Sequence, residues 1–293
     1  MTSLQASHGR PVGEVWIILV NYNGLPHILD CLTSLKNQTY HEREIVVVDN
    51  ASHDDSLRVI QRRFPWVRLL SSPINGGFAQ GANLGLNLAL EQGAQAAWLL
   101  NPDATAHPHA LAALVRAMES DPRVGAVGSL LRWAGQDRVQ AWGGGKVNLI
   151  TGRSRHHTKP TPQGAPDYLC GASLLLRCQA LRQVGLLDSD FPLYWEDADL
   201  CWRLRREGWR LAVAQDSLVE HRPSSGLAGD ERAWHRLYTG GSVRFFRKHA
   251  PLPWLAVALS AGGRLARRAA QGRWSAVSGI WQGIFSPGWG RLP

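Results

Sequence analysis

The chain has 293 residues, of which 44% are hydrophobic and 19% charged, and its formal net charge is +9. This composition predicts a globular protein with one large core and room for an appendage, and it excludes a collagen-like or disordered chain. The four cysteines show no metal-site or disulfide spacing, which indicates reduced thiols and a cytoplasmic protein. No signal peptide and no uncharged apolar run of about 18 residues occurs, so no membrane-spanning segment is predicted.

Strands and helices alternate through the first half of the chain. Short apolar runs predict buried strands at 14–20, 44–48, 67–70, 98–100 and 124–128. Amphipathic patterns between them predict helices at 26–35, 56–64, 77–92 and 108–119. This βαβ repetition predicts an α/β fold with a mostly parallel central sheet flanked by helices.

The second half of the chain is less regular. Residues 132–167 are rich in Gly, Arg, His and Pro, so we expect a long, mobile connection near the substrate, with the regular pattern resuming at 167–176. Further amphipathic helices are predicted at 251–260 and 262–285. The expected organisation is a loose tail over 1–13, a domain over 14–250 and a basic helical extension over 251–293.

The net charge is concentrated in the last quarter of the chain. Residues 222–293 hold 11 Lys and Arg against two Asp and Glu, together with five of the 13 tryptophans. Basic and aromatic residues on amphipathic helices favour an anionic surface, and we expect membrane lipid before nucleic acid, for which no motif is present. A helix packed on the domain with a solvated basic face is the structural alternative.

Polar residues follow the first, second and fourth predicted strands at their carboxyl ends. They are Asn21, Tyr22 and Asn23, then Asp49 and Asn50, then Asn101 and Asp103. Ligands of open α/β sheets bind at this edge, and a carboxylate such as Asp103 can hold a divalent cation that takes its other oxygens from phosphates. Helix capping and an ordinary turn are the alternatives.

A Gly-rich loop follows the third strand and contains Asn75, Gly77 and Phe78. Its glycines permit close backbone approach, and the next helix offers its N-terminus to a phosphate, although a plain turn would look the same. The loop is not G-x-G-x-x-G and does not follow the first strand. A dinucleotide-binding dehydrogenase is therefore disfavoured.

The segment 194–203 carries three carboxylates, those of Glu196, Asp197 and Asp199, within an apolar and aromatic frame. Such a frame makes ionised carboxylates costly unless they are paired, hydrogen-bonded or near a cation. The first turn of a helix also favours acidic residues and is the structural alternative.

Six segments, in this order, resemble the family 2 glycosyltransferases of the GT-A fold, in their rhamnosyltransferase-like branch. They are 20–24, 47–52, 75–83, 99–104, 170–175 and 196–203. The resemblance covers residues 14–250 and implies a GT-A, nucleotide-diphospho-sugar transferase fold. It implies an inverting hexosyltransferase that uses Mg²⁺ or Mn²⁺ and acts in cell-surface polysaccharide synthesis. The branch suggests rhamnose as the sugar.

The resemblance also implies residue roles. The donor pocket would be lined by Asn21, Tyr22, Asn23, Asp49, Asn50, Asn75, Gly77, Phe78, Asn83 and Asn101. Asp103 and His221 would bind the metal, although Asn101 stands where the Asp-x-Asp motif has its first acid. Asp197 would be the general base, with Glu196 beside it.

These roles suit the chemistry of transfer from a nucleotide-diphosphate sugar. A base must deprotonate the hydroxyl of a glycan or polyprenyl-linked acceptor, and a cation must stabilise the departing phosphate. One carboxylate suits a single displacement with inversion. The expected location is the cytoplasm, peripheral on the inner face of the cell membrane.

Two alternatives stay open. A nucleotidylyltransferase would carry a basic Gly-rich loop after its first strand, and 21–24 lacks the cation. A non-catalytic GT-A-like binding module would have lost the acids, and Asp103 and Asp197 are present.

Overall fold

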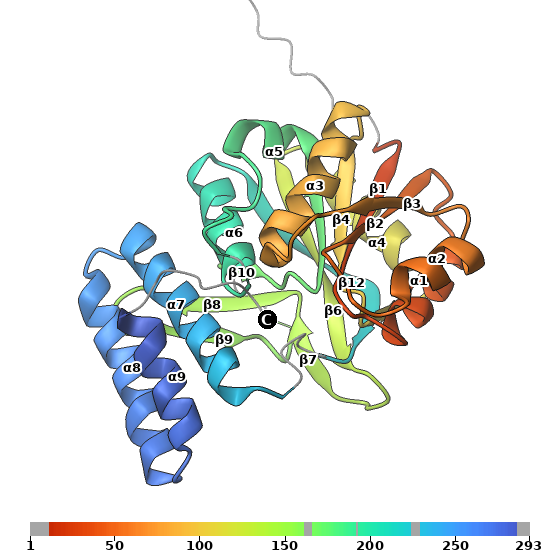
Figure 1. Ribbon diagram of the computed structural model, residues 1–293. Helices are drawn as coiled ribbons and strands as arrows, with labels where there is room; N and C mark the ends of the chain where they lie inside the picture. Colours follow the sequence, from red (N-terminus) through yellow and green to blue (C-terminus); the bar gives the residue numbers. More distant parts are fainter. Residues whose placement is uncertain (1–11, 161–165, 192, 224–228, 286–293) are drawn as a thin grey trace, which may run out of the picture.

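The computed structural model describes residues 12–160, 166–191, 193–223 and 229–285, and these form a mixed α/β body with a group of helices at one side (Figure 1). The expected tail over 1–13 lies mostly outside the described residues. Its end is already packed, because Val12 is buried and its N–H donates to Glu119 Oε1 at 2.8 Å.

A nine-stranded sheet with the order β3-β2-β1-β4-β11-β6-β12-β5, and with β7 paired to β6, forms the centre of the described chain. Its strands are β1 Val15–Asn21, β2 Arg43–Asp49, β3 Arg68–Ser71, β4 Ala96–Leu100, β5 Ala104–Ala106, β6 Val124–Trp133, β7 Val139–Trp142, β11 Ser173–Arg177 and β12 Arg210–His221. The five strands predicted from apolar runs are confirmed as β1 to β4 and β6.

The predicted parallel arrangement is correct for only part of this sheet. Strands β3, β2, β1 and β4 are parallel, joined by helical crossovers. Strand β11 is antiparallel to both β4 and β6, and β5 is antiparallel to β12. Strand β7 is antiparallel to β6, as their short connection over 134–138 requires, because a parallel pair needs a long crossover.

Helices cover both faces of the sheet. They are α1 His27–Lys36, α2 Ser56–Arg63, α3 Gly77–Glu91, α4 Ala110–Glu119, α5 Cys178–Val184, α6 Glu196–Arg206, α7 Glu231–His249, α8 Pro253–Ala270 and α9 Trp274–Phe285. Strand β1 is buried on both sides, so its residues alternate between two cores. Ile18 packs with Leu86 of α3, whereas Ile17 packs in the core that contains Leu32 of α1.

The expectation of a mobile connection over 132–167 is wrong for the residues that the structure describes there. They form β7, β8 Gly144–Asn148 and β9 Arg153–His156, and β8 pairs with β9 and with β10 Tyr168–Leu169 in a small sheet. Glycine is needed for this packing, because a Cβ on Gly144 would lie 1.8 Å from the Tyr168 carbonyl oxygen. Residues 161–165 lie outside the described residues.

The last three helices pack together beside the small sheet (Figure 1). Helix α9 approaches α7 closely, since a Cβ on Gly279 would lie 2.3 Å from the Arg232 carbonyl oxygen. The predicted helix break near 261 is wrong. Helix α8 continues to Ala270 and the chain turns at Gly272, where φ is +68°. In the described part of the chain, no helix is long and apolar enough to cross a bilayer.

Candidate active site

The carboxyl ends of β1 and β2 bring Asn21 and Asp49 together, because these two residues pair in register. Asn21 is fully buried, and its Nδ2 donates to Asp49 Oδ1 at 3.1 Å and to Ser56 Oγ at 2.8 Å. The Ser52 N–H donates to Asp49 Oδ2 at 3.2 Å. Asn21 therefore orients the Asp49 carboxylate at the edge of the sheet where the nucleotide is expected.

Tyr22 and Asn23 lie above this pair and are more exposed. Asn23 has φ of 49°, and its Oδ1 accepts from the His53 N–H at 2.7 Å. The Tyr22 ring meets the His53 ring edge-on, with centroids 6.5 Å apart. The two loops after β1 and β2 are thus joined where the donor is expected.

The Gly-rich loop is attached to the same edge. Asn50 Nδ2 donates to Asn75 Oδ1 at 2.8 Å and to the Gly77 carbonyl at 3.1 Å. Gly77 has φ of +85°, a conformation that side chains rarely adopt, and Phe78 packs against the core just after it. The start of α3 is therefore placed beside the end of β2.

Asn83 lies further along α3 and makes a different contact. Its Nδ2 donates to the Leu187 carbonyl at 2.8 Å, and its Oδ1 accepts from the Leu187 N–H at 3.1 Å. The nitrogen and the oxygen of the Asn83 side-chain amide therefore both bind the backbone of the 184–190 loop. This arrangement favours a positioning role for Asn83 over the direct donor contact that the sequence predicts.

The turn between β4 and β5 brings Asn101 and Asp103 to His221. Because β5 pairs with β12, His221 lies opposite Ala104, and its Nε2 is 3.2 Å from Asp103 Oδ1 and 3.2 Å from Asn101 Nδ2. All three predicted residues thus meet at one point. Sequence reasoning missed Gln140 of β7, whose Oε1 lies 2.9 Å from His221 Nδ1.

These residues suit a divalent cation that takes some of its ligands from the protein and the others from a bound substrate. If Gln140 accepts from Nδ1–H, the Nε2 lone pair of His221 faces the Asp103 carboxylate, an arrangement that a cation would stabilise. The described residues contain no group of three or more His, Cys, Asp or Glu that could hold a metal by themselves. Asp103 and His221 would therefore supply two ligands, and diphosphate and water the others.

The acidic segment begins α6 after an unusual backbone conformation. Tyr194 and Trp195 both have positive φ, of 71° and 74°, which costs about 1–3 kcal/mol for each non-glycine residue. Aromatic packing holds them, because the Trp195 ring lies 5.0 Å from Phe245 and 5.5 Å from Phe246 of α7. The helix start is confirmed, and α7 fixes the direction in which it presents its acids.

Asp197 is held at this turn by two backbone donors. Its Oδ2 accepts from the Gly171 N–H at 2.8 Å and its Oδ1 from the Ala198 N–H at 2.7 Å. Burial nevertheless raises the pKa of Asp197. Burial, and then the charge of Asp197, raises the pKa of Glu196 well above its usual value. Two adjacent carboxyl groups with raised pKa values are typical of acid–base sites.

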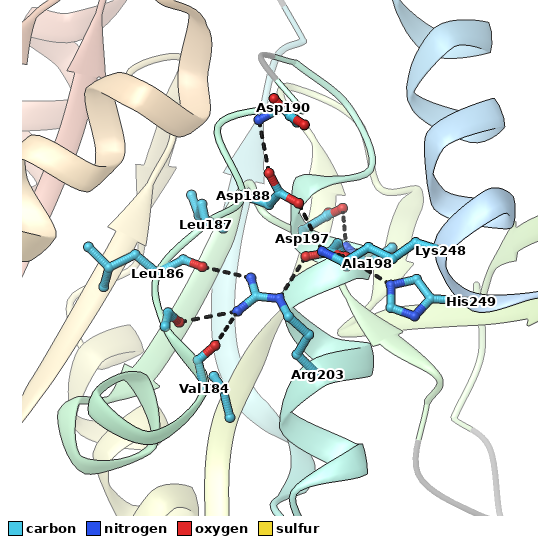
Figure 2. A network of polar contacts seen from close by, with 12 residues as sticks. Val184, Leu186, Leu187, Asp188, Asp190, Asp197, Ala198, Arg203, Lys248 and His249 are labelled. Atoms are coloured by element: carbon cyan, nitrogen blue, oxygen red, sulfur yellow. Dashed lines mark hydrogen bonds and ion pairs between the residues drawn. The ribbon is translucent and has the colours of Figure 1, made fainter.

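The third acid, Asp199, has a structural role that the sequence did not assign. It is fully buried and joins a network between α6 and α7, whose members Arg203, Lys248 and His249 are drawn in Figure 2. Arg203 Nε donates to its Oδ2 at 2.7 Å, while Lys248 Nζ and His249 Nε2 lie 2.7 Å and 2.8 Å from its Oδ1. Burial opposes ionisation, but hydrogen bonds from His249 and Lys248 and the charge of Arg203 lower the pKa of Asp199 to about 2.

Arg203 extends this network to the 184–190 loop. Its Nη1 donates to the Val184 carbonyl at 2.7 Å and its Nη2 to the Leu186 carbonyl at 2.6 Å (Figure 2). The next residue, Leu187, is the one that Asn83 binds. Hydrogen bonds therefore connect α3, beside the donor edge, with the helix that carries Asp197.

Comparison with known proteins identifies the family. Residues 16–185 match the family model of glycosyl transferase family 2, which is more than half of the chain. The chain belongs to this family. Its sequence is 27% identical over 270 residues to the N-acetylglucosaminyl-diphospho-decaprenol L-rhamnosyltransferase of Mycobacterium tuberculosis, across 81% of this chain and 87% of that protein.

Solved structures support the fold of this family 2 glycosyltransferase. The mannosyltransferase PcManGT from Pyrobaculum calidifontis, in complex with GDP-Man and Mn²⁺, superimposes with a TM-score of 0.58 at 21% identity, over 94% of this chain and 84% of that one. GalNAc-T7 with UDP, GalNAc and Mn²⁺ gives 0.63 at 16% identity, over 82% and 48% of the two chains. The GT-A fold is thereby confirmed, and neither the nucleotidylyltransferase nor the non-catalytic alternative is favoured.

Proposed function

We propose that the enzyme transfers a sugar, with inversion, from a nucleotide-diphosphate donor to a hydroxyl of a lipid-linked or glycan acceptor in cell-surface polysaccharide synthesis. The observation that carries the proposal is the Asp197 carboxylate, held at the start of α6 by two backbone N–H groups in a protein that also pairs Asp103 with His221. The mycobacterial relative is named for L-rhamnose and a diphospho-decaprenol acceptor. Rhamnose from a thymidine-diphosphate donor is therefore our first choice.

The donor would lie along the carboxyl edge of β1, β2 and β4. Asp49, oriented by Asn21, offers a carboxylate to the ribose or base, and Tyr22 offers a ring beside it. Asp103 and His221 would hold Mg²⁺ or Mn²⁺ at the diphosphate, as two structurally similar glycosyltransferases contain Mn²⁺. When bound, the cation supplies positive charge to the departing nucleotide diphosphate.

The acceptor hydroxyl would give its proton to Asp197. The raised pKa of Asp197 makes its carboxylate a stronger base than that of a solvent-exposed aspartate, and the hydrogen bond from the Gly171 N–H fixes its orientation. Glu196 retains its proton to higher pH than an ordinary glutamate, which lets Asp197 carry the negative charge of the pair. A single base on the acceptor side favours one displacement and inversion.

The C-terminal helices would bring this site to the membrane. Among the residues that the structure describes, exposed apolar side chains gather on α8 and α9; they are Trp254, Leu255, Leu259, Trp274, Trp281 and Phe285. Residues 232–293 include no Asp or Glu. Apolar side chains beside an excess of cations fit an anionic lipid surface, and we infer peripheral binding there.

The decisive experiment measures binding and turnover across a panel of nucleotide sugars, with and without Mn²⁺, for the wild type and Asp197→Asn. We expect one donor to bind in a metal-dependent manner, with turnover lowered about 10²- to 10⁴-fold in Asp197→Asn while donor binding persists. Product with a retained anomeric configuration would contradict inversion. Equal turnover in the variant would contradict the role of Asp197.

A further inference from the structure

Two arginines on α8 form no ion pair with an acidic residue in the part of the chain that the structure describes. Arg264 and Arg268 lie one turn apart and are half-buried. The buried Nη1 of Arg264 and the buried Nε of Arg268 find no hydrogen-bond acceptor among the described residues. Burial lowers the pKa of Arg264, with Tyr238 acting the other way and the charges of Arg267 and Arg268 adding to the decrease.

The acidic side chains of the described residues do not supply a counter-charge. No Asp or Glu in the described ranges forms an ion pair with Arg264 or Arg268, and the residues outside those ranges include no Asp or Glu. The carboxylate of Glu231 is already paired with Arg273. Two partly desolvated cations one turn apart repel each other, and a bound anion would relieve this repulsion.

A buried histidine reports the same excess of positive charge. His235 of α7 is almost fully buried, and its pKa falls to about 4 because of burial and the charges of Arg268 and Arg264, with Glu231 acting the other way. The electrostatic potential between α7 and α8 is therefore positive, in a region where the side chains have little contact with water.

This positive region is connected to the catalytic turn by aromatic rings. The Arg264 guanidinium lies 5.0 Å from the centre of the Tyr238 ring. Tyr238 stacks on Trp234 with centroids 5.1 Å apart, and lies 5.7 Å from Trp195 and 6.1 Å from Tyr194. The last two residues directly precede Glu196, so one ring separates the arginines from the acid turn.

Tyr194 belongs to the same group of rings and is affected by the charges of both acidic turns. Burial raises the pKa of Tyr194 to about 12, and the charge of Glu196 and, less strongly, that of Asp103 add to this effect. Tyr194 thus lies within the electrostatic reach of both the acid turn and the metal turn. On the far side, Tyr238 Oη is 3.0 Å from Ser154 Oγ of β9, and α7 and α8 lie beside that strand in Figure 1.

We propose that Arg264 and Arg268 bind the diphosphate of a lipid-linked acceptor sugar, with the reacting hydroxyl of that sugar toward Asp197. The proposal rests on the function proposed above. Guanidinium groups bind phosphate oxygens in bidentate fashion, and two of them match the two phosphates. The apolar side chains of α8 would then take the start of the lipid chain.

The test compares two water-soluble acceptors that carry the same sugar, one as a short-chain prenyl diphosphate and one as a neutral alkyl glycoside. No vesicles are present, so lipid headgroups cannot contribute. We expect the wild type to prefer the diphosphate in kcat/KM, and Arg264→Gln and Arg268→Gln each to reduce this preference about tenfold or more. Arg267→Gln, at an exposed position between them, is the control and should keep the preference.

Two further measurements separate this site from folding and from the donor site. Donor hydrolysis in the absence of acceptor should be unchanged in both variants. Their Tm should change little, because removal of an uncompensated charge offsets the loss of the Arg264–Tyr238 contact and of the Arg268–Gln271 hydrogen bond. Arg264→Lys provides a variant that keeps the charge without the bidentate geometry.

The possible results distinguish the two proposals. A wild-type preference for the diphosphate that survives in both variants overturns the assignment of Arg264 and Arg268 and leaves the proposed function intact. A wild type without any preference contradicts a diphosphate-linked acceptor. A preference lost equally in Arg267→Gln would show a general charge effect and would also overturn the site.

Discussion

At the scale of single residues, the two carboxyl groups that we propose for acid–base catalysis differ in what surrounds them. Asp197 accepts two backbone hydrogen bonds, whereas the Glu196 Oε2 is buried and finds no hydrogen-bond partner among the described residues. A neutral carboxyl group tolerates such a position far better than a carboxylate. The pair can therefore share its charge unequally, with Asp197 ionised and Glu196 protonated.

This difference predicts the pH dependence of the variant Glu196→Gln. The raised pKa of Glu196 means that the folded wild type binds this proton more tightly than the unfolded chain, so wild-type stability decreases as pH rises above the usual carboxyl pKa. Glutamine cannot ionise. The variant should therefore gain up to about 1.4 kcal/mol relative to the wild type for each pH unit in that window.

Urea unfolding at several pH values measures this gain, and the two proteins should be equally stable near pH 4. Asp199→Asn should show the opposite trend, because the stability contributed by a carboxyl group with lowered pKa is lost only as pH falls toward 2. A constant difference between Glu196→Gln and wild type at all pH values would contradict a raised pKa.

The metal turn gives a second prediction at this scale. Gln140 orients the imidazole of His221, so Gln140→Leu should raise the Mn²⁺ concentration for half-maximal turnover about tenfold, as expected for a partner of a metal ligand. His221→Ala should raise it further. His41→Ala removes an exposed histidine and serves as the control for adventitious metal binding. Identical Mn²⁺ curves for all variants would exclude His221 as a ligand.

At the scale of elements, the Asp199 network fixes α6 against α7. Asp199→Asn would leave Arg203 and Lys248 without their shared carboxylate, which typically costs about 3–5 kcal/mol for a buried pair. His249→Gln keeps an N–H donor toward Asp199 and should cost much less than His249→Leu. Turnover should fall together with stability, less in His249→Gln than in His249→Leu, because α6 also carries Asp197, the proposed base.

The control for this network is an ion pair on the same loop. Arg244 pairs with Asp190 at 2.6 Å, and the Asp190 side chain is 69% exposed, so Arg244→Gln should cost less than about 1 kcal/mol. Equal losses for Arg244→Gln and Asp199→Asn in urea unfolding would show that burial of the network does not matter.

The elements also show what a sequence can predict in this fold. Strands β1, β2 and β4 are buried on both faces, so they appear as continuous apolar runs, and the polar residues that follow them necessarily meet at one edge. Strand β8 could not be recognised, since its glycines resemble a loop and are explained only by the close approach of Tyr168 to Gly144 and of the Arg155 carbonyl to Gly145. Arg203 is the local partner of the anchor Asp199, but its other partners, Lys248 and His249, lie about 50 residues away, so the sequence did not separate it from Asp197, the proposed base.

At the scale of the whole molecule, the C-terminal helices carry both the exposed apolar side chains and the excess of positive charge. Trp254 on α8 and Trp281 on α9 are 60% and 58% exposed. The Arg247 guanidinium lies 5.7 Å from the centre of the Trp254 ring, so cation and apolar surface are adjacent. A lipid surface into which the tryptophans insert would therefore also contact the charge of Arg247.

Replacing these tryptophans tests membrane binding without removing α8 and α9, whose loss would expose α7. Burial of a large apolar side chain contributes about 1.5–3 kcal/mol, so Trp254→Ala and Trp281→Ala should each weaken binding to anionic vesicles about tenfold. Flotation provides the measurement, and binding should also decrease as salt screens the arginines.

Trp66→Ala is the control. It removes an exposed tryptophan that packs on Phe64, far from these helices in the chain, and should bind as the wild type does. Unchanged flotation of the double variant Trp254→Ala/Trp281→Ala would show that this face does not bind lipid, and the helices would then be a packed extension with a solvated basic surface.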